Sequence, residues 1–278
     1  MSRLTINSVA RETMVEVRAY FGTFATLTAA FVFLPALAFG LLLPAEVQRV
    51  RMPAPGVLPH FPAWFVPAVL VAITLQSLVT LTIAAIAGDP ARVPHETVGQ
   101  TLTRMLPALL RYLGALVLLF LAYIVLALPF GLIITFAVGA LAAIGGGTNA
   151  GTANTAVGIA ILILLPTLLW VGARLSPMIG VFAIERTSPL AGIRRAWRLS
   201  AGSAWRIVLL VILVSFAGIV VAFAAQGVAV AFGSAMVIAG SPTVARIALG
   251  TVTGAVNGLL FVLFSAGLGV IYRQLAER

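Results

Sequence analysis

Residues 207–232 read IVLLVILVSFAGIVVAFAAQGVAVAF, a run without a single charged side chain. As an α-helix this run would be about 39 Å long, whereas the hydrocarbon core of a bilayer is about 30 Å thick. A helix that is apolar on every side is buried in a large core or in a membrane. Because backbone hydrogen bonds must be satisfied internally in lipid, the stretch predicts a transmembrane helix.

The composition of the whole chain agrees with this interpretation. Of its 278 residues 62% are hydrophobic and only 9% are charged, and the mean hydropathy is +1.15. A soluble domain of this size keeps a polar shell in water, which this composition cannot supply. We therefore expect one integral membrane domain over residues 1–278, and the class of soluble enzymes is excluded.

Similar apolar runs recur along the chain, and we expect a polytopic bundle of six transmembrane helices. The expected spans are approximately Tyr20–Leu43, Phe65–Ala87, Tyr112–Ile144, Ala156–Ile184, Ile207–Phe232 and Ile247–Tyr272.

The arginines predict the orientation of these spans. All 17 basic residues are arginine. Six spans put thirteen of them on the side of both termini and three on the other side, with Arg174 inside a span. Basic residues are enriched in cytoplasmic loops, so we expect both termini in the cytoplasm and a location in the bacterial inner membrane. The net charge of +10 is then a topology signal, and nucleic-acid binding is not expected.

The chain has features of a threefold internal repeat. Arg18, Arg111 and Arg206 each end a mixed segment and precede an apolar run, and they are 93 and 95 residues apart. Each unit would comprise a cytoplasmic interfacial helix, a span, an outer connection and a second span. The expected units are 1–93, 94–187 and 188–278, although similar hydropathy alone could also produce this pattern.

The segment before the fifth span predicts an amphipathic helix that lies in the lipid headgroup layer. Its apolar positions recur at helical spacing and are Leu190, Ile193, Trp197, Ala201 and Ala204, with Arg194, Arg195 and Arg198 opposite. We expect Ser188 to cap this helix and Gly202 to mark its end. The candidate contacts with anionic lipid are Arg194, Arg195, Trp197, Arg198, Trp205 and Arg206. The alternative is that the helix merely joins two spans. A weaker version, Val98 to Leu109 with Arg104 turned away, precedes the third span.

Arg174 is the only charged residue inside an expected span, and such residues are costly in lipid. Either it has a structural role and reaches toward the headgroups, or it contacts an anion that crosses the membrane. Its expected partners are carbonyl groups freed near Pro166 or Pro177, or the side chains of Gln76, Gln226 and Asn257. Arg174, Gln76 and Asn257 therefore form the candidate intramembrane polar site.

Three glycines in the last span, Gly250, Gly254 and Gly258, lie at GxxxG spacing on one helix face. Small residues at this spacing let two helix backbones approach closely. The pattern predicts tight packing and does not distinguish a contact within the chain from a homo-oligomer formed through the last helix.

Residues that carry enzyme chemistry are scarce. The chain has no cysteine, and its two histidines, His60 and His95, fall on opposite sides of the membrane. Neither HExxH nor GxSxG occurs. Glu12 and Glu16 lie one helical turn apart near Arg11, which is typical of a solvated face. We expect no metal, no cofactor and no catalytic activity.

The stretch from Arg174 to Leu210 resembles a family of bacterial multi-pass membrane proteins. The residues that carry the resemblance are Arg174, Pro177, Glu185, Arg194, Arg195, Trp197, Arg198, Leu199, Gly202, Trp205 and Arg206, with the tyrosine of the later VIYRQLAER. The family is the membrane domain that precedes the catalytic domain of some glycerophosphoryl diester phosphodiesterases and also occurs alone. Nothing here resembles the catalytic domain, so the resemblance implies a membrane module without diesterase activity.

Two functions remain from the sequence. The first is a non-catalytic module that organises the membrane or contacts lipid. The alternative is a transporter or channel for a small or lipid-like anionic solute, with Arg174 as the contact. Intramembrane carboxylates typical of ion-coupled transporters are absent from the expected spans, which weighs against coupled transport.

Overall fold

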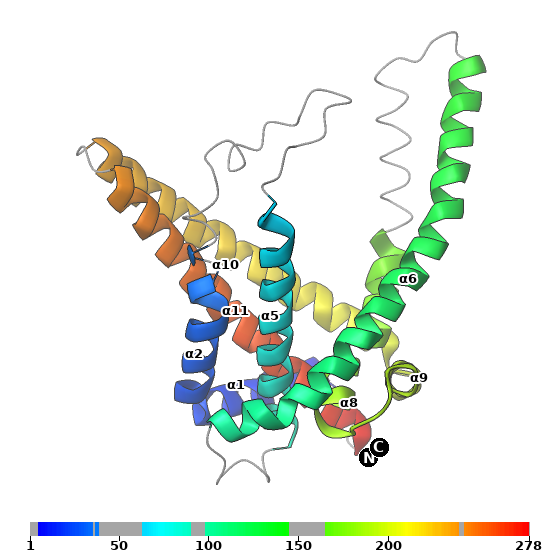
Figure 1. Cartoon of the computed structure of the whole chain (residues 1–278), viewed down its shortest axis with the longest axis horizontal. Coiled ribbons are helices and arrows are strands. Elements are labelled where there is room, and N and C mark those ends of the chain that lie inside the picture. Colours follow the sequence, from blue (N-terminus) through cyan, green and yellow to red (C-terminus); the bar gives the residue numbers. More distant parts are fainter. Residues whose placement is uncertain are drawn as a thin grey trace.

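The structure is a computed structural model and describes residues 5–35, 37–38, 63–89, 98–144, 165–238 and 242–277. These residues form helices and turns without a strand, which confirms the expected all-α fold. The helices are α1 (Ile6–Ala19), α2 (Phe21–Thr28), the π-helix η1 (Ala29–Phe33), α5 (Phe65–Gly88), α6 (Val98–Ile144), a helical segment over 165–175, α8 (Met178–Ile184), α9 (Pro189–Leu199), α10 (Ala204–Ile238) and α11 (Pro242–Ala276) (Figure 1).

Among the described residues, five stretches are long and apolar enough to cross a membrane. They are Phe65–Gly88, Val98–Val125, Leu165–Ile184, Ala204–Phe232 and Ile247–Ala276. They overlap the second to sixth expected spans, the third of them only over Tyr112–Val125. The first expected span, Tyr20–Leu43, begins as a shorter apolar helix, Phe21–Phe33, and residues 39–43 lie outside the described ranges. Residues 156–164 of the fourth expected span also lie outside them.

The segment before the third span is not a separate helix. Residues from Val98 onward continue without interruption into the span as α6, which has 47 residues. Pro107 lacks the N–H that would bond to the Thr103 carbonyl, and proline at such a position favours a bend. In Figure 1 the start of α6 runs across the lower end of the molecule before the helix turns upward. A bend therefore replaces the expected helix boundary.

The amphipathic segment before the fifth span does form a helix of its own, α9. Ser188 precedes it in extended conformation but makes no capping hydrogen bond through its side chain, and Pro189 occupies the first turn. The helix ends at Leu199, and Gly202 has a φ of 80°, a left-handed conformation that glycine adopts without strain. The expected end of the helix at Gly202 is confirmed to within three residues.

Packing is densest at the lower end of Figure 1, where α1 and the last turns of α11 meet α5. Nearly every residue of α5 from Ser77 to Gly88 is buried. Gly269 of α11 lies against the α5 backbone, because a Cβ there would be 2.5 Å from the Ala84 carbonyl oxygen. The outer faces of α6 and α10 instead expose large apolar side chains, Phe216 and Phe223 among them. This distribution suits a protein that is surrounded by lipid.

The glycine series of the last span packs against the first apolar helix of the same chain. A Cβ on Gly250 would be 3.0 Å from Leu37, one on Gly254 2.6 Å from Phe33 and one on Gly258 3.2 Å from Thr28. The prediction of close helix packing is confirmed, and its partner is intramolecular. A homo-oligomer through the last helix would have to use another face of α11.

Candidate functional site

The guanidinium of Arg174 lies against two tryptophan rings that also contact each other. Its Cζ is 5.0 Å from the ring centroid of Trp170, one turn earlier, and 5.1 Å from that of Trp197 on α9. The two rings contact each other edge to face at 5.4 Å. A guanidinium over an aromatic ring gains about 0.5–1 kcal/mol when exposed and about 2 kcal/mol when desolvated. The pair of rings therefore stabilises a charge inside an apolar helix and holds α9 against the preceding segment.

The polar site that we expected around Arg174 is not assembled. Within the described part of the chain Arg174 contacts Trp170 and Trp197, and its Nε is buried without a hydrogen-bond partner. Gln76 on α5 and Asn257 on α11 have exposed side chains and no hydrogen bond to Arg174. The sequence predicted carbonyl and amide partners for Arg174, whereas its partners are the π faces of Trp170 and Trp197.

Glu185, at the end of α8, joins three helices. Its carboxylate accepts from Arg195 Nε at 3.2 and 3.3 Å and from the Tyr272 hydroxyl at 2.8 Å. Arg195 belongs to α9 and Tyr272 to α11. Charge-assisted hydrogen bonds of this kind are about twice as strong as neutral ones. The carboxylate thus fixes the orientation of α9 at the end of the bundle.

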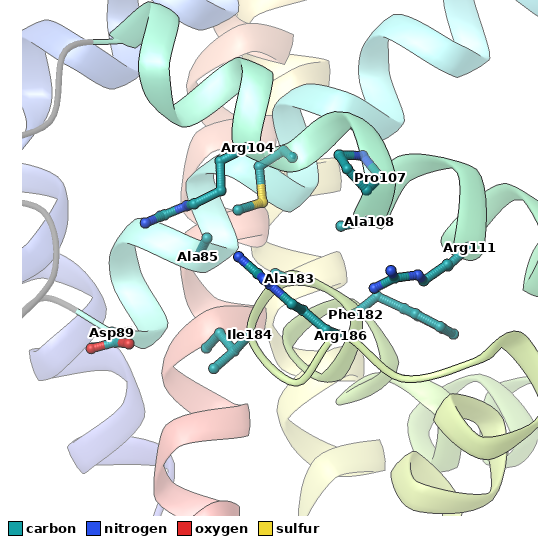
Figure 2. Close-up of a pocket in the computed structure, with 11 residues that line it drawn as sticks. Ala85, Asp89, Arg104, Pro107, Ala108, Arg111, Phe182, Ala183, Ile184 and Arg186 are labelled. Carbon is teal, nitrogen blue, oxygen red and sulfur yellow. The ribbon is translucent and has the colours of Figure 1, made fainter.

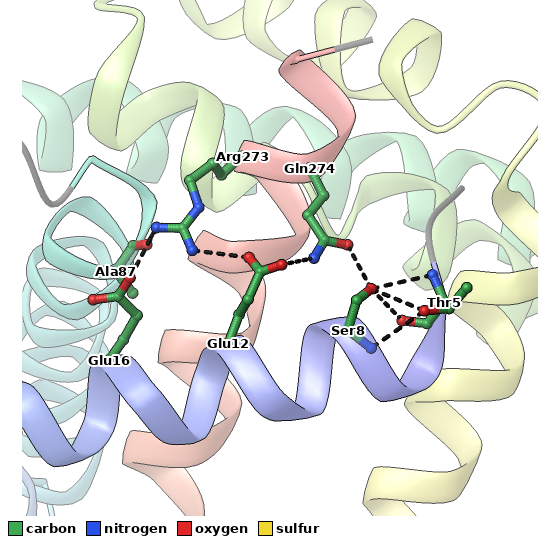
Figure 3. A network of polar contacts seen from close by, with 7 residues as sticks. All are labelled: Thr5, Ser8, Glu12, Glu16, Ala87, Arg273 and Gln274. Carbon is green, nitrogen blue, oxygen red and sulfur yellow. Dashed lines mark hydrogen bonds and ion pairs between the residues drawn. The ribbon is translucent and has the colours of Figure 1, made fainter. Parts of the chain in front are cut away.

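Arg273 forms a second polar cluster, which links α11 to α1 (Figure 3). Its two terminal nitrogens donate to Glu16 and Glu12, each at 2.9 Å, and one also donates to the Ala87 carbonyl at 3.1 Å. Gln274 donates to Glu12 at 2.6 Å. The expectation that Glu12 and Glu16 form a solvated face is wrong, because both carboxylates bind Arg273 and Glu16 is buried. A local sequence pattern cannot reveal a partner more than 250 residues away.

The outer face of α9 carries exposed basic and aromatic side chains. Arg194, Trp197 and Arg198 are exposed there, and Trp205 and Arg206 continue the exposed surface at the start of α10. Trp205 is 73% exposed. We call these five residues the basic–aromatic face. All five are among the lipid contacts expected from the sequence.

The buried face of α9 differs from the expected one. It is formed by Gly192 and Ala196, whereas Leu190 is exposed. Gly192 lies so close to the Phe182 ring of α8 that a Cβ at residue 192 would overlap it. Arg195, expected on the lipid side, turns inward to Glu185. A residue without a side chain is needed at position 192 because the Phe182 ring occupies the space of a Cβ, and a hydrophobicity pattern does not indicate that requirement.

The described residues contain no group of three histidine, cysteine or acidic side chains that could hold a metal ion. His60 and His95 lie outside the described ranges. Comparison with protein-family models, with curated proteins and with solved structures finds no match. The function must therefore be inferred from the geometry.

Proposed function

We propose that this chain is a non-catalytic, multi-pass protein of the bacterial inner membrane that contacts anionic lipid headgroups at its cytoplasmic end. The observation that carries the proposal is the basic–aromatic face. Tryptophan favours the headgroup layer, and each arginine near an anionic surface gains about 1 kcal/mol. Trp197 also packs on Trp170, but a helix that merely joined two spans would have no need of the exposed Arg194, Arg198, Trp205 and Arg206.

The contact between α1 and α11 supports six spans and a common side for both helix ends. Arg273 binds Glu12 and Glu16, so the start of α1 and the end of α11 lie on the same side. An even number of crossings must separate them, whereas five stretches have the length of a span. A sixth crossing within Tyr20–Leu43 satisfies this parity. The positive-inside rule then assigns the arginine-rich side to the cytoplasm.

The contacts of Arg174 favour a structural role over an anion pathway. Two tryptophan rings lie against its guanidinium, and Trp197 ties it to α9. A solute that used Arg174 as a contact would have to compete with these rings. We keep transport of a small or lipid-like anionic solute as the alternative function, to be separated by the Arg174 variants described below.

The resemblance to the membrane domain of glycerophosphoryl diester phosphodiesterases agrees with this proposal. Several residues that carry the resemblance touch one another, since Glu185 binds Arg195 and Tyr272, and Arg174 binds Trp197. A motif whose members contact one another in two clusters has a structural reason to occur as a set. We infer that the chain shares the architecture of that family, with a possible threefold repeat of units 1–93, 94–187 and 188–278.

Lipid selectivity of the purified protein tests the proposal. The full chain is reconstituted in liposomes of phosphatidylglycerol and phosphatidylcholine and extracted in mild detergent, and the lipids that remain bound are counted by mass spectrometry. We expect phosphatidylglycerol to be enriched several-fold. The triple variant Arg194→Gln, Arg198→Gln, Arg206→Gln should lose most of this enrichment, whereas the charge-preserving triple lysine variant should keep it. Equal retention of both lipids by the wild-type protein would refute the proposal.

A further inference from the structure

A cavity of about 280 Å³ lies between the end of α5, the first turns of α6 and the end of α8 (Figure 2). Its volume is near the lower limit of small-molecule sites, which span roughly 300–1,000 Å³. The lining residues are Ala85, Asp89, Arg104, Met105, Pro107, Ala108, Arg111, Phe182, Ala183, Ile184 and Arg186. None of the sequence motifs considered above accounts for this combination of residues.

The charge of the cavity is strongly positive. Arg104 and Arg111 of α6 and Arg186 after α8 all line it, with Arg186 drawn between the other two in Figure 2, and Asp89 lies at its edge as the one carboxylate among the described lining residues. Neither Arg111 nor Arg186 has an ion-pair partner in the described part of the chain. Like charges that converge in a partly enclosed space repel one another, and an anion between them lowers that energy.

Two turns of one helix supply the upper wall. Arg104 and Arg111 are seven residues apart on α6, so their side chains project from nearly the same helix face. Pro107 lies between them at the bend and faces the cavity. The bend therefore directs both arginines toward the ends of α5 and α8.

Arg186 enters the cavity from a strained backbone. Its φ is 42°, a left-handed conformation that is uncommon for residues other than glycine. The preceding residue, Glu185, is held by Arg195 and Tyr272, which fixes the position from which Arg186 turns. Backbone strain of this kind persists where the surrounding contacts fix the residue, often at ligand-binding sites.

We propose that this cavity binds a phosphate group. A phosphate presents oxygens in several directions and so can accept from more than one guanidinium at once, whereas a carboxylate presents two oxygens in one plane. Phe182, Met105 and Ile184 give the cavity an apolar wall beside the arginines, which suits a phosphate ester carried on an organic group. The two sources that share this chemistry are a phospholipid headgroup and a soluble phosphate.

The inference does not depend on the basic–aromatic face, because none of the five residues of that face lines the cavity. The basic–aromatic face would select anionic lipid collectively, whereas the cavity would hold one phosphate per chain. Variants in the two places therefore separate the two proposals. Cavity variants should keep the general enrichment of phosphatidylglycerol, and variants of the face should keep the stoichiometric site.

Two binding measurements on the full chain identify the site and the source of the phosphate. The first is a calorimetric titration of inorganic phosphate into the protein in phosphatidylcholine nanodiscs. Chloride at equal ionic strength is the control. In the second, phosphatidic acid is added to the discs and the lipid bound per chain is counted by native mass spectrometry. Saturation at one site in the first assay identifies a soluble phosphate, and saturation in the second alone identifies a headgroup. Absence of a saturable site in both overturns the proposal.

The variants locate the site. We expect Arg111→Gln and Arg186→Gln each to weaken binding about tenfold or more, which corresponds to the loss of one charge-assisted contact. Arg18→Gln removes the same charge from an exposed position on α1 that lies in neither the cavity nor the basic–aromatic face, and it should stay within twofold of the wild type. Equal loss in Arg18→Gln would contradict a site in the cavity.

Arg186→Gly distinguishes lost binding from lost folding. Glycine accepts the left-handed backbone at residue 186, so the variant should melt at or above the temperature of the wild type while its binding falls about tenfold or more. A variant that melts as the wild type does and still binds phosphate as tightly would show that Arg186 is not a ligand, which overturns the proposal.

Discussion

Arg273 donates from Nη1 to the carboxylate of Glu16 at 2.9 Å, although 257 residues separate the two along the chain. The Glu16 side chain is 11% exposed and that of Arg273 is 19% exposed. A carboxylate with so little access to water depends on its partner, because the penalty for leaving it unpaired exceeds the net gain of the pair itself. The contact makes the end of α11 part of the support for α1.

We expect Arg273→Gln to lower the free energy of unfolding by about 2 kcal/mol, since Glu16 would keep a poorly solvated charge. Unfolding of the purified protein in detergent, followed by circular dichroism, measures the effect. Arg18→Gln is the control, because Arg18 is exposed on the same end of the molecule. In the double variant Arg273→Gln, Glu16→Gln the loss should be smaller than the sum of the single losses. Strict additivity would mean that the two residues do not interact.

Gly269→Ala should destabilise the bundle by about 1–3 kcal/mol, the usual cost of overpacking. The added Cβ would lie 2.5 Å from the Ala84 carbonyl oxygen, and a backbone atom cannot move aside as a flexible side chain can. Gly227→Ala on α10 is the matched control. Nothing lies within 4 Å of a Cβ there, so it should be neutral or stabilising by up to about 1 kcal/mol through helix propensity. Thermal unfolding of both variants in the same detergent measures the two effects. A loss of stability in Gly227→Ala equal to that in Gly269→Ala would contradict the close contact between α11 and α5.

Arg174→Leu should loosen α9, because the two tryptophan rings lose the cation that lies against both of them. Trypsin cleaves after arginine, so digestion within Arg194–Arg198 should become several-fold faster, while Arg174→Lys should show a smaller increase. If Arg174 instead contacts a transported anion, anion flux in proteoliposomes should fall in Arg174→Leu while the digestion rate stays that of the wild type.

Gly202→Ala should cost about 1 kcal/mol of stability. The φ of 80° at this position is left-handed, and a Cβ there is strained even though no neighbour lies within 4 Å. Gly99→Ala serves as the comparison, since Gly99 is helical and also open. Hydrogen exchange at Ser203 and Ala204 should rise only in the Gly202 variant. Equal exchange in the two variants would show that the left-handed turn at Gly202 is not the cause of the lost stability.

Features that depend on local sequence could be predicted. Charge-free runs predicted the approximate positions of five apolar helices, because a helix that crosses lipid needs about 20 apolar residues in succession, although the third begins earlier than expected. The start and end of α9 followed from Ser188, Pro189 and Gly202, and the glycine series indicated close packing. Each of these inferences needs only neighbours within one or two helical turns.

Features that depend on distant partners could not be predicted. Glu12 and Glu16 bind Arg273 from the other end of the chain, and Arg174 binds a ring on another helix. The buried face of α9 is set by the shape of Phe182, which excludes any side chain at Gly192. Nothing in the sequence indicates that Arg186 lies near Arg104 and Arg111, because about 75 residues separate it from Arg111 and only the fold places all three around one cavity.

The Arg273 cluster also bears on the order of events during synthesis. At roughly 5–20 residues per second, a ribosome needs on the order of 10–50 seconds to reach Arg273 after completing Glu16. During this interval Glu12 and Glu16 of α1 lack Arg273 as a partner. The helices synthesised first are then in the bilayer without the contact that joins α1 to α11. A nascent chain that stalls before Arg273 would therefore keep Glu12 and Glu16 without the cation that binds both of them in the complete bundle.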